Sequence, residues 1–251
     1  MSFVVVVSPA KKMNVVDEEP GPRGLPRFLP RTAELMEAVR SLSLEEAKAL
    51  WKTSDALTRL NFERFADMDL ERDVTAAVVA YEGIQYTHLA AQVMGEREFA
   101  WLDAHLRILS GFYGVLRPFD GVVPYRLEMQ ARLAVGGANN LYEYWGATLC
   151  QALAEEASTI VNVASKEYAK AVVPYAAGCG MRVVTCVFAT LVDGRLRQQA
   201  TEAKAARGTF CRWLAERGID DTDGLRAFGE RGYALSRERS SDGELVFVRD
   251  A

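Results

Sequence analysis

Three short apolar runs constrain the fold of this chain more than any other feature. They lie at residues 3–7, 76–81 and 159–164, and each is rich in β-branched or small apolar residues. Runs of this length that end in polar or turn residues are typical of strands buried on both faces of a sheet. Amphipathic helical patterns lie between them, and residues 181–199 read as a β-hairpin with Asp193 and Gly194 at its turn. The sequence therefore predicts a mixed α and β fold, of the α+β class, with a central sheet and surrounding helices in a single domain spanning residues 1–251.

Polar residues follow two of these predicted strands directly. Ser8, Lys11 and Lys12 come after the first strand, and Ser165 comes after the third. In open α/β sheets the carboxyl ends of the strands are a common place for ligand-binding groups. The alternative is that the two lysines are solvated turn residues with no ligand.

Residues 105–129 form an irregular segment with an unusual density of polar and aromatic side chains. It contains Arg107, Arg117, Arg126, Ser110, Tyr113, Tyr125, Asp120 and Glu128. Arginine suits bidentate recognition of carboxylate or phosphate, so this segment is a candidate anion site. The same arginines could instead pair with Asp120 and Glu128 in an internal network that fixes the loop.

Two helical stretches also point to anions. At residues 44–66, a capping box formed by Ser43 and Glu46 opens the first of two short helices, and Ser54 lies between them. This pattern resembles a helix-hairpin-helix, which offers backbone amides to a phosphodiester, although a purely structural helical hairpin is the alternative. Residues 204–217 read as a helix with Lys204 and Arg207 at its start, where positive charge opposes the helix dipole unless an anion is bound.

Composition excludes several classes of protein. A net charge of -4 argues against a uniformly basic surface that coats nucleic acid, although a local basic cleft is compatible with it. No apolar run approaches the roughly 20 residues of a membrane span, so we expect a cytoplasmic protein with no membrane partner. The four cysteines include no CxxC pair and the two histidines have no metal-ligand spacing, so we expect neither a metal site nor a cofactor.

Six segments, in the same order along nearly the whole chain, resemble the peroxide stress resistance protein YaaA family, also called DUF328 or UPF0246. They are SPAKKMN, LRILSGFYGVLRPFDGVVPYRLEM, LYEYWG, NVASKEY, AKAARG and SSDGELVF. The resemblance implies a cytosolic bacterial protein that protects against hydrogen peroxide by limiting unincorporated intracellular iron. It also implies the cantaloupe fold, with a helix-hairpin-helix and a basic cleft that binds duplex and branched DNA. One departure is Glu202, where the family often has tyrosine, since a carboxylate there would weaken attraction to phosphate.

Two hypotheses of function follow. In the first, a DNA-binding stress protein holds duplex or branched DNA without sequence preference. Its candidate DNA-binding or anion-binding residues are Ser8, Lys11, Lys12, Ser54, Arg107, Ser110, Arg117, Arg126, Lys204 and Arg207. In the second, an enzyme acts on a small anionic or nucleotide-like substrate, with Tyr125, Glu128 or Tyr168 as acid or base and Asn162 among the orienting groups. The hypotheses differ in whether the basic residues line an open cleft or a small cavity.

Overall fold

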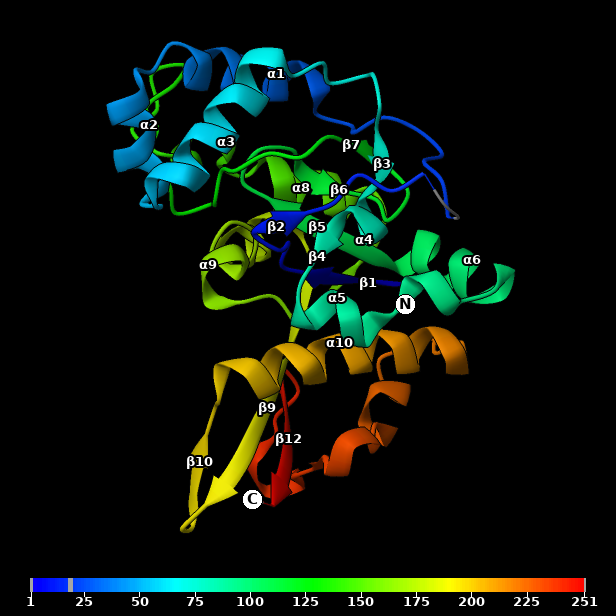
Figure 1. The fold of residues 1–251 in the computed structure, drawn as a ribbon. Helices are drawn as coiled ribbons and strands as arrows, with labels where there is room; N and C mark the ends of the chain where they lie inside the picture. Colours follow the sequence, from blue (N-terminus) through cyan, green and yellow to red (C-terminus); the bar gives the residue numbers. More distant parts are fainter. Residues whose placement is uncertain (1, 18–19, 251) are drawn as a thin grey trace.

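The computed structural model describes residues 2–17 and 20–250 and has a mixed α and β architecture with a central sheet (Figure 1). Among the described residues, the sheet has eight strands in the order β11-β12-β9-β8-β1-β5-β6, with β10 paired to β9. Two small two-stranded sheets, β2-β4 and β3-β7, lie outside it. The predicted fold class is confirmed.

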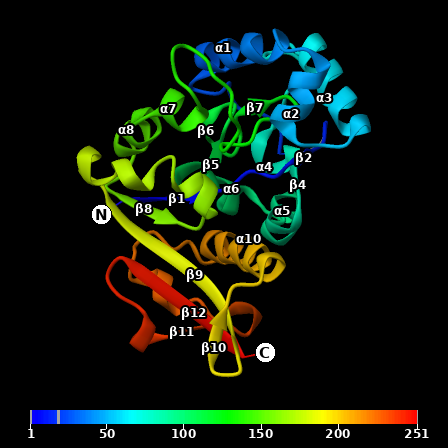
Figure 2. The same cartoon turned by 90° about the vertical axis from the view of Figure 1, so that its left-hand side faces the viewer.

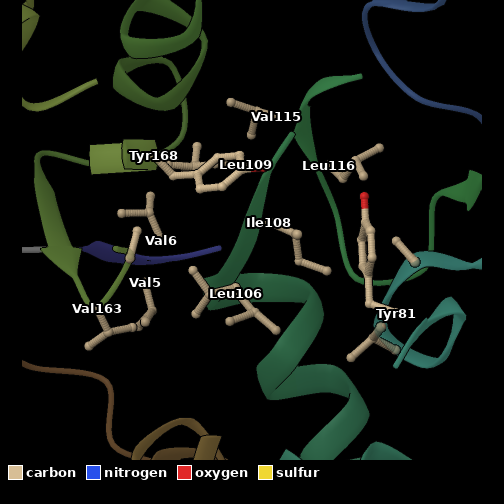
Figure 3. Close-up of a cluster of buried hydrophobic side chains, with 14 of the residues drawn as sticks. Val5, Val6, Tyr81, Leu106, Ile108, Leu109, Val115, Leu116, Val163 and Tyr168 are labelled. Carbon is tan, nitrogen blue, oxygen red and sulfur yellow. The ribbon is translucent and has the colours of Figure 1, made fainter. Parts of the chain in front are cut away.

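Three parallel strands form the centre of the sheet. Strand β1 (Phe3–Val7) lies between β5 (Leu106–Ser110) and β8 (Thr159–Asn162), and all three are buried along their whole length. Figure 3 shows Val5, Val6, Leu106 and Ile108 in one cluster of buried apolar side chains. Strand β1 pairs on one side with the next long strand of the chain and on the other side with a much later one. Its carboxyl end is therefore a topological switch point, where open α/β sheets bind ligands.

The outer half of the sheet extends away from this centre (Figure 2). Strand β9 (Arg182–Val192) begins parallel to β8 and continues parallel to β12 (Glu244–Asp250). It turns at Asp193 and Gly194, both with positive φ, into β10 (Arg195–Arg197), which confirms the predicted hairpin. Strand β11 (Ala234–Leu235) completes this edge, and β6 (Gly114–Leu116) is the opposite edge.

Helices surround the sheet on several sides. Helices α1 (Leu29–Arg40), α2 (Leu44–Trp51) and α3 (Asp55–Asp67) gather at one end of the molecule (Figure 1). The others that the structure describes are α4 (Ala77–Ala80), α5 (Ile84–Leu89), α6 (Glu96–His105), α7 (Leu141–Trp145), α8 (Thr148–Ala154), α9 (Lys166–Ala169) and α10 (Ala200–Arg217). Within the part of the chain that is described, none of the helices combines the length and apolar character that a bilayer span requires.

The run at residues 76–81 is not the buried strand that its composition predicts. It forms β3 (Thr75–Ala76), a single helical turn α4 (Ala77–Ala80) and β4 (Tyr81–Glu82). The run is buried throughout, as expected, but a continuous apolar run fits a buried helical turn as well as a strand. The two ends of the run are strands because β3 pairs with β7 (Gly121–Val122) and β4 pairs with β2 (Lys12–Met13).

Helix α10 also begins earlier than the sequence predicts. It starts at Ala200, so Lys204 and Arg207 lie in its second and third turns rather than at its amino end. The first turn carries Glu202, which forms ion pairs with Arg231 at 3.1 Å and Arg249 at 2.8 Å. The predicted conflict between a basic helix start and the helix dipole is therefore absent, because an acidic residue occupies that turn.

Candidate functional site

A cavity of about 490 Å³ lies beyond the carboxyl ends of β1 and β8, between residues of β2, β4, α5, α9 and α10. Nine of the residues predicted for a site line it, although they come from distant parts of the sequence. They are Ser8, Lys11, Lys12, Tyr125, Arg126, Glu128, Tyr168, Lys204 and Arg207. The strand-end residues and the end of the 105–129 segment thus meet in one place.

Hydrogen bonds between strand ends build one wall of this cavity. The Ser8 hydroxyl donates to Ser165 Oγ at 3.2 Å and accepts the Ser165 backbone N–H at 2.8 Å. The Ser8 carbonyl accepts from Gln85 Nε2 and from the Tyr86 hydroxyl, each at 3.0 Å. These bonds tie the end of β1 to the loop after β8 and to α5, so the wall is held from three elements.

Two glycines allow close backbone packing beside the cavity. A Cβ on Gly111 would lie 2.6 Å from the Leu127 carbonyl oxygen, so glycine lets residues 127–129 pack against the end of β5. A Cβ on Gly208 would lie 2.0 Å from the Gln85 carbonyl oxygen, so glycine lets α10 pack directly on α5. The first contact brings Glu128 to the cavity, and the second brings Arg207.

Three of the five cations that line the cavity are paired with carboxylates. Glu128 Oε1 lies 2.8 Å from Arg126 Nη2 and 3.3 Å from Lys11 Nζ. Lys12 Nζ lies 2.5 Å from Glu82 Oε1. The predicted pairing of the segment's arginines with Glu128 is therefore confirmed for Arg126.

Arg207 differs from these three cations because its side chain is largely buried but forms no ion pair with a described carboxylate. Its Nε is buried and finds no hydrogen-bond acceptor among the described residues. Burial lowers the pKa of Arg207, and the group that acts against this is the Cys211 thiol rather than a carboxylate. A buried guanidinium donor without an acceptor is costly, so an anion in the cavity would be stabilised there.

The two candidate tyrosines are buried, which makes them unsuitable as bases. The Tyr125 hydroxyl lies 2.6 Å from Ser110 Oγ and 2.8 Å from the Tyr81 hydroxyl, and burial raises the pKa of Tyr125 to about 12. Burial also raises the pKa of Tyr168 well above its usual value. Both phenols stay protonated at neutral pH, so they can donate or accept a hydrogen bond but cannot act as a base. Ser110 lies behind Tyr125 and binds the Phe112 and Tyr113 amides.

Two of the three arginines in the 105–129 segment lie elsewhere, so the predicted cluster of three is wrong. Arg107 and Arg117 line a separate cavity of about 270 Å³. Arg107 Nε lies 2.6 Å from Glu156 Oε2, and Arg117 Nη2 lies 3.5 Å from Glu156 Oε1. Asp120 instead accepts the Arg117 backbone N–H at 2.8 Å, so its predicted role as an ion-pair partner is also wrong.

Asp120 gives a pH-dependent prediction. Burial raises the pKa of its carboxyl from about 3.8 to about 6, so between these pH values the folded chain holds a proton that the unfolded chain has released. The free energy of unfolding should therefore fall as pH rises through this window, by on the order of 2 kcal/mol. Asp120→Asn should flatten this dependence, because its amide oxygen can still accept the Arg117 N–H. Urea unfolding at pH 4.5 and pH 7 measures this free energy in both proteins. If the variant showed the same change in the free energy of unfolding between the two pH values as the wild type, the prediction would be refuted.

A second groove of about 870 Å³ adjoins the first cavity. The two share Lys11, Arg126 and Glu128 as a common border. Beyond this border the second groove runs past Arg132 to Trp51 and Lys52 at the end of α2. Ser54 is the N-cap residue of α3 and does not line either space, and Asn162 uses its side chain to bind Thr185 and the Ala164 amide. We call the two joined spaces the basic groove.

Comparison with known proteins assigns the family. The family model for the peroxide stress protein YaaA matches residues 3–239. The chain belongs to the YaaA family. A UPF0246 protein of Pediococcus pentosaceus is 43% identical over 246 residues, covering 98% of each chain. A UPF0246 protein of Lactiplantibacillus plantarum is 45% identical over 245 residues, covering 97% of this chain and 98% of its own.

Four polar residues that line the cavity of this YaaA-family chain are not among those that the sequence predicts. They are Glu82, Gln85, Tyr86 and Glu167. Glu167 follows Ser165 and Lys166 after a predicted strand, so the strand-end argument could have included it. Burial and the neighbouring Glu128 raise the pKa of Glu167. Tyr86 and Gln85 gave no signal, because their role depends on the packing of α5 against the end of β1.

The described part of this YaaA-family chain brings together no group of three or more His, Cys, Asp or Glu side chains that could hold a metal ion. The acids at the cavity lie beside cations instead, as Glu128 does between Lys11 and Arg126. The basic groove therefore suits an anion rather than a cation. The hypothesis of an enzyme stays a prediction. Of its three acid or base candidates, all of which line the cavity, Glu128 is the one that carries a carboxyl group.

Proposed function

We propose that this peroxide stress protein binds duplex or branched DNA in the basic groove without reading its sequence. The observation that carries the proposal is the continuity of the groove. It runs from Lys204 and Arg207 on α10, across Lys11 and Arg126, to Lys52 at the end of α2. A phosphodiester backbone is a line of regularly spaced charges, and cations spaced along one groove match it better than a single cluster would.

The charge along the groove supports the same proposal. Beyond the ion pairs of Glu128 and Glu82, the groove has Lys52, Arg132, Lys204 and Arg207 available for phosphates. Neutralising these phosphates would release counterions and supply affinity that depends on salt but not on sequence. The net charge of -4 is compatible with this, since several cations line one groove even though the chain as a whole is acidic.

The helical hairpin at one end of the groove gives further support. Helices α2 and α3 are joined by residues 52–54, and the predicted capping box of Ser43 and Glu46 is present at the start of α2. Ser54 makes no side-chain cap bond at the start of α3, so the first amides of that 13-residue helix are not satisfied by their N-cap residue. Ser54 lies outside the basic groove, so these amides would suit a phosphate of DNA that continues past the end of the groove, as expected for a helix-hairpin-helix.

We also propose that the protein acts in the cytosol and that its protection against peroxide includes a lower level of unincorporated iron. This part of the proposal is supported by family membership alone. It can be tested by whole-cell electron paramagnetic resonance of chelatable iron in cells with and without the protein. Equal iron signals in the two strains would remove the iron part and leave the DNA part standing.

Arg132→Gln tests whether the second groove belongs to the DNA site. Arg132 is exposed and lines that groove, so we expect its replacement to weaken binding of a duplex several-fold and to reduce the dependence on salt by about one phosphate. Arg237→Gln is the matched control, because Arg237 is exposed on the side of the molecule near β11. Fluorescence anisotropy with a labelled duplex measures both. Equal loss in the two variants would refute a role for the groove.

A further inference from the structure

Within the basic groove, the 490 Å³ cavity has the features of a small-ligand pocket rather than of an open track. Its size falls in the range of about 300–1,000 Å³ that is typical of such pockets. One nucleotide fits inside a space of this size, whereas a duplex in the basic groove could only pass across its mouth. The wall formed by Ser8, Ser165, Gln85 and Tyr86 is fixed by four hydrogen bonds, so the cavity is preformed.

The charges that line the cavity are unevenly matched. Glu128 and Glu82 neutralise the cations on one side, as described above. Lys204 and Arg207 lie three residues apart on α10, which places them on one face of the helix, and no described carboxylate pairs with either. Two unmatched positive charges on one wall suit a dianion better than the single charge of an internal phosphodiester. A terminal phosphate monoester carries about -1.5 to -2 charges at pH 7.

Apolar and aromatic side chains occupy another part of the same cavity. Pro9, Ile84 and Leu127 line it together with Tyr86 and Tyr168. Ile84 is 38% exposed although it is a large apolar residue, so part of this surface is uncovered. Bases stack favourably on such surfaces, and hydroxyl groups like that of Ser8 suit a sugar or a base edge.

We propose that this cavity binds one nucleotide through its terminal phosphate monoester, with Lys204 and Arg207 holding the phosphate and the apolar wall holding the base. The nucleotide has two possible sources, which are the 5′-phosphorylated end of a DNA strand and a free nucleoside monophosphate. For the first source the inference rests on the proposed DNA groove. For the second source it is independent of DNA binding.

Isothermal titration of the whole chain with deoxyadenosine 5′-monophosphate, deoxyadenosine and inorganic phosphate tests the proposal. We expect the monophosphate to bind at least about 10-fold more tightly than either fragment, because only it reaches both ends of the cavity. Lys204→Gln and Arg207→Gln should each weaken its binding about 10-fold, and Arg217→Gln, an exposed site on the same helix, should not. Lys204 is exposed, so Lys204→Gln should fold normally. It therefore tests phosphate binding even if Arg207→Gln lowers the stability of the fold.

A second arm compares a single-stranded oligonucleotide that has a 5′-phosphate with the same strand that has a 5′-hydroxyl. Tighter binding of the phosphorylated strand identifies the DNA end as the ligand, whereas binding of the free monophosphate alone identifies a nucleotide. If deoxyadenosine monophosphate binds no better than its fragments and the 5′-phosphate makes no difference, the proposal is overturned. DNA binding that persists in that case leaves the proposed function standing, so the two failures are distinguishable.

Discussion

Glu156→Ala is expected to lower the free energy of unfolding by about 3 kcal/mol or more. Arg107 is only 5% exposed at its side chain and pairs with Glu156 Oε2 at 2.6 Å. Its guanidinium also donates to the Asp103 and Leu106 carbonyls. Removing the carboxylate would leave a buried charge without its counterion, which typically costs about 3–5 kcal/mol. Urea denaturation monitored by circular dichroism would measure the change.

The adjacent Glu155 provides the matched control. Glu155 pairs with Arg27 at 2.8 Å, but both side chains are largely exposed, at 62% and 47%. Exposed ion pairs contribute about 0–1 kcal/mol, so Glu155→Ala should have little effect. Similar losses in the two variants would show that burial does not make the Arg107 pair important. The measurement therefore separates a buried structural arginine from the ligand-binding role that the sequence suggested for it.

Gly208→Ala is expected to destabilise the fold by about 2 kcal/mol or more and to disturb the cavity. The added methyl group would lie 2.0 Å from the Gln85 carbonyl oxygen and 2.9 Å from the His88 Cβ, so α10 would have to move away from α5. Because α10 carries Lys204 and Arg207 and α5 carries Tyr86, the variant should also bind DNA more weakly. Thermal unfolding and DNA anisotropy measure the two effects.

Gly178→Ala is the control for this substitution. A Cβ at Gly178 meets nothing within 4 Å, and its backbone is not in the left-handed region. Alanine there should be neutral or stabilising by up to about 1 kcal/mol, because it restricts the unfolded chain. If both glycine variants unfold at the same temperature as the wild type, the close contact of α5 with α10 does not constrain the fold.

Several elements could be predicted from the sequence because local chemistry alone determines them. The central strands at residues 3–7 and 159–162 follow from short, mostly apolar β-branched runs. The turn at Asp193 and Gly194 follows from residues that tolerate positive φ. Residues 76–81 could not be assigned in this way, because burial on all sides removes the periodicity that distinguishes helix from strand.

The sequence predicts the site residues that follow parallel strands, because the carboxyl ends of such strands meet at one edge of the sheet. It does not predict where the residues of the 105–129 segment lie, because that depends on how the chain turns back after β5. Ser8, Lys11 and Ser165 come together because β1 and β8 are parallel neighbours with their carboxyl ends at one edge. Arg107 lies near the amino end of β5, and antiparallel β6 pairs Leu116 with Ile108, so Arg117 returns to that same end. Arg126 lies in the cavity beyond the other end of β5. Nothing in the sequence shows this reversal, so three arginines that are close in sequence separate into two sites.

The measurement that tests the central claim most directly is the affinity of the wild-type chain for a duplex as a function of salt concentration. If four to six phosphates contact the basic groove, the logarithm of the association constant should fall linearly with the logarithm of salt concentration, with a slope of about -4 to -5. Binding should be equal for duplexes of unrelated sequence, because the contacts are to the backbone. Absence of binding at low salt, or an affinity that does not change with salt, would contradict the account.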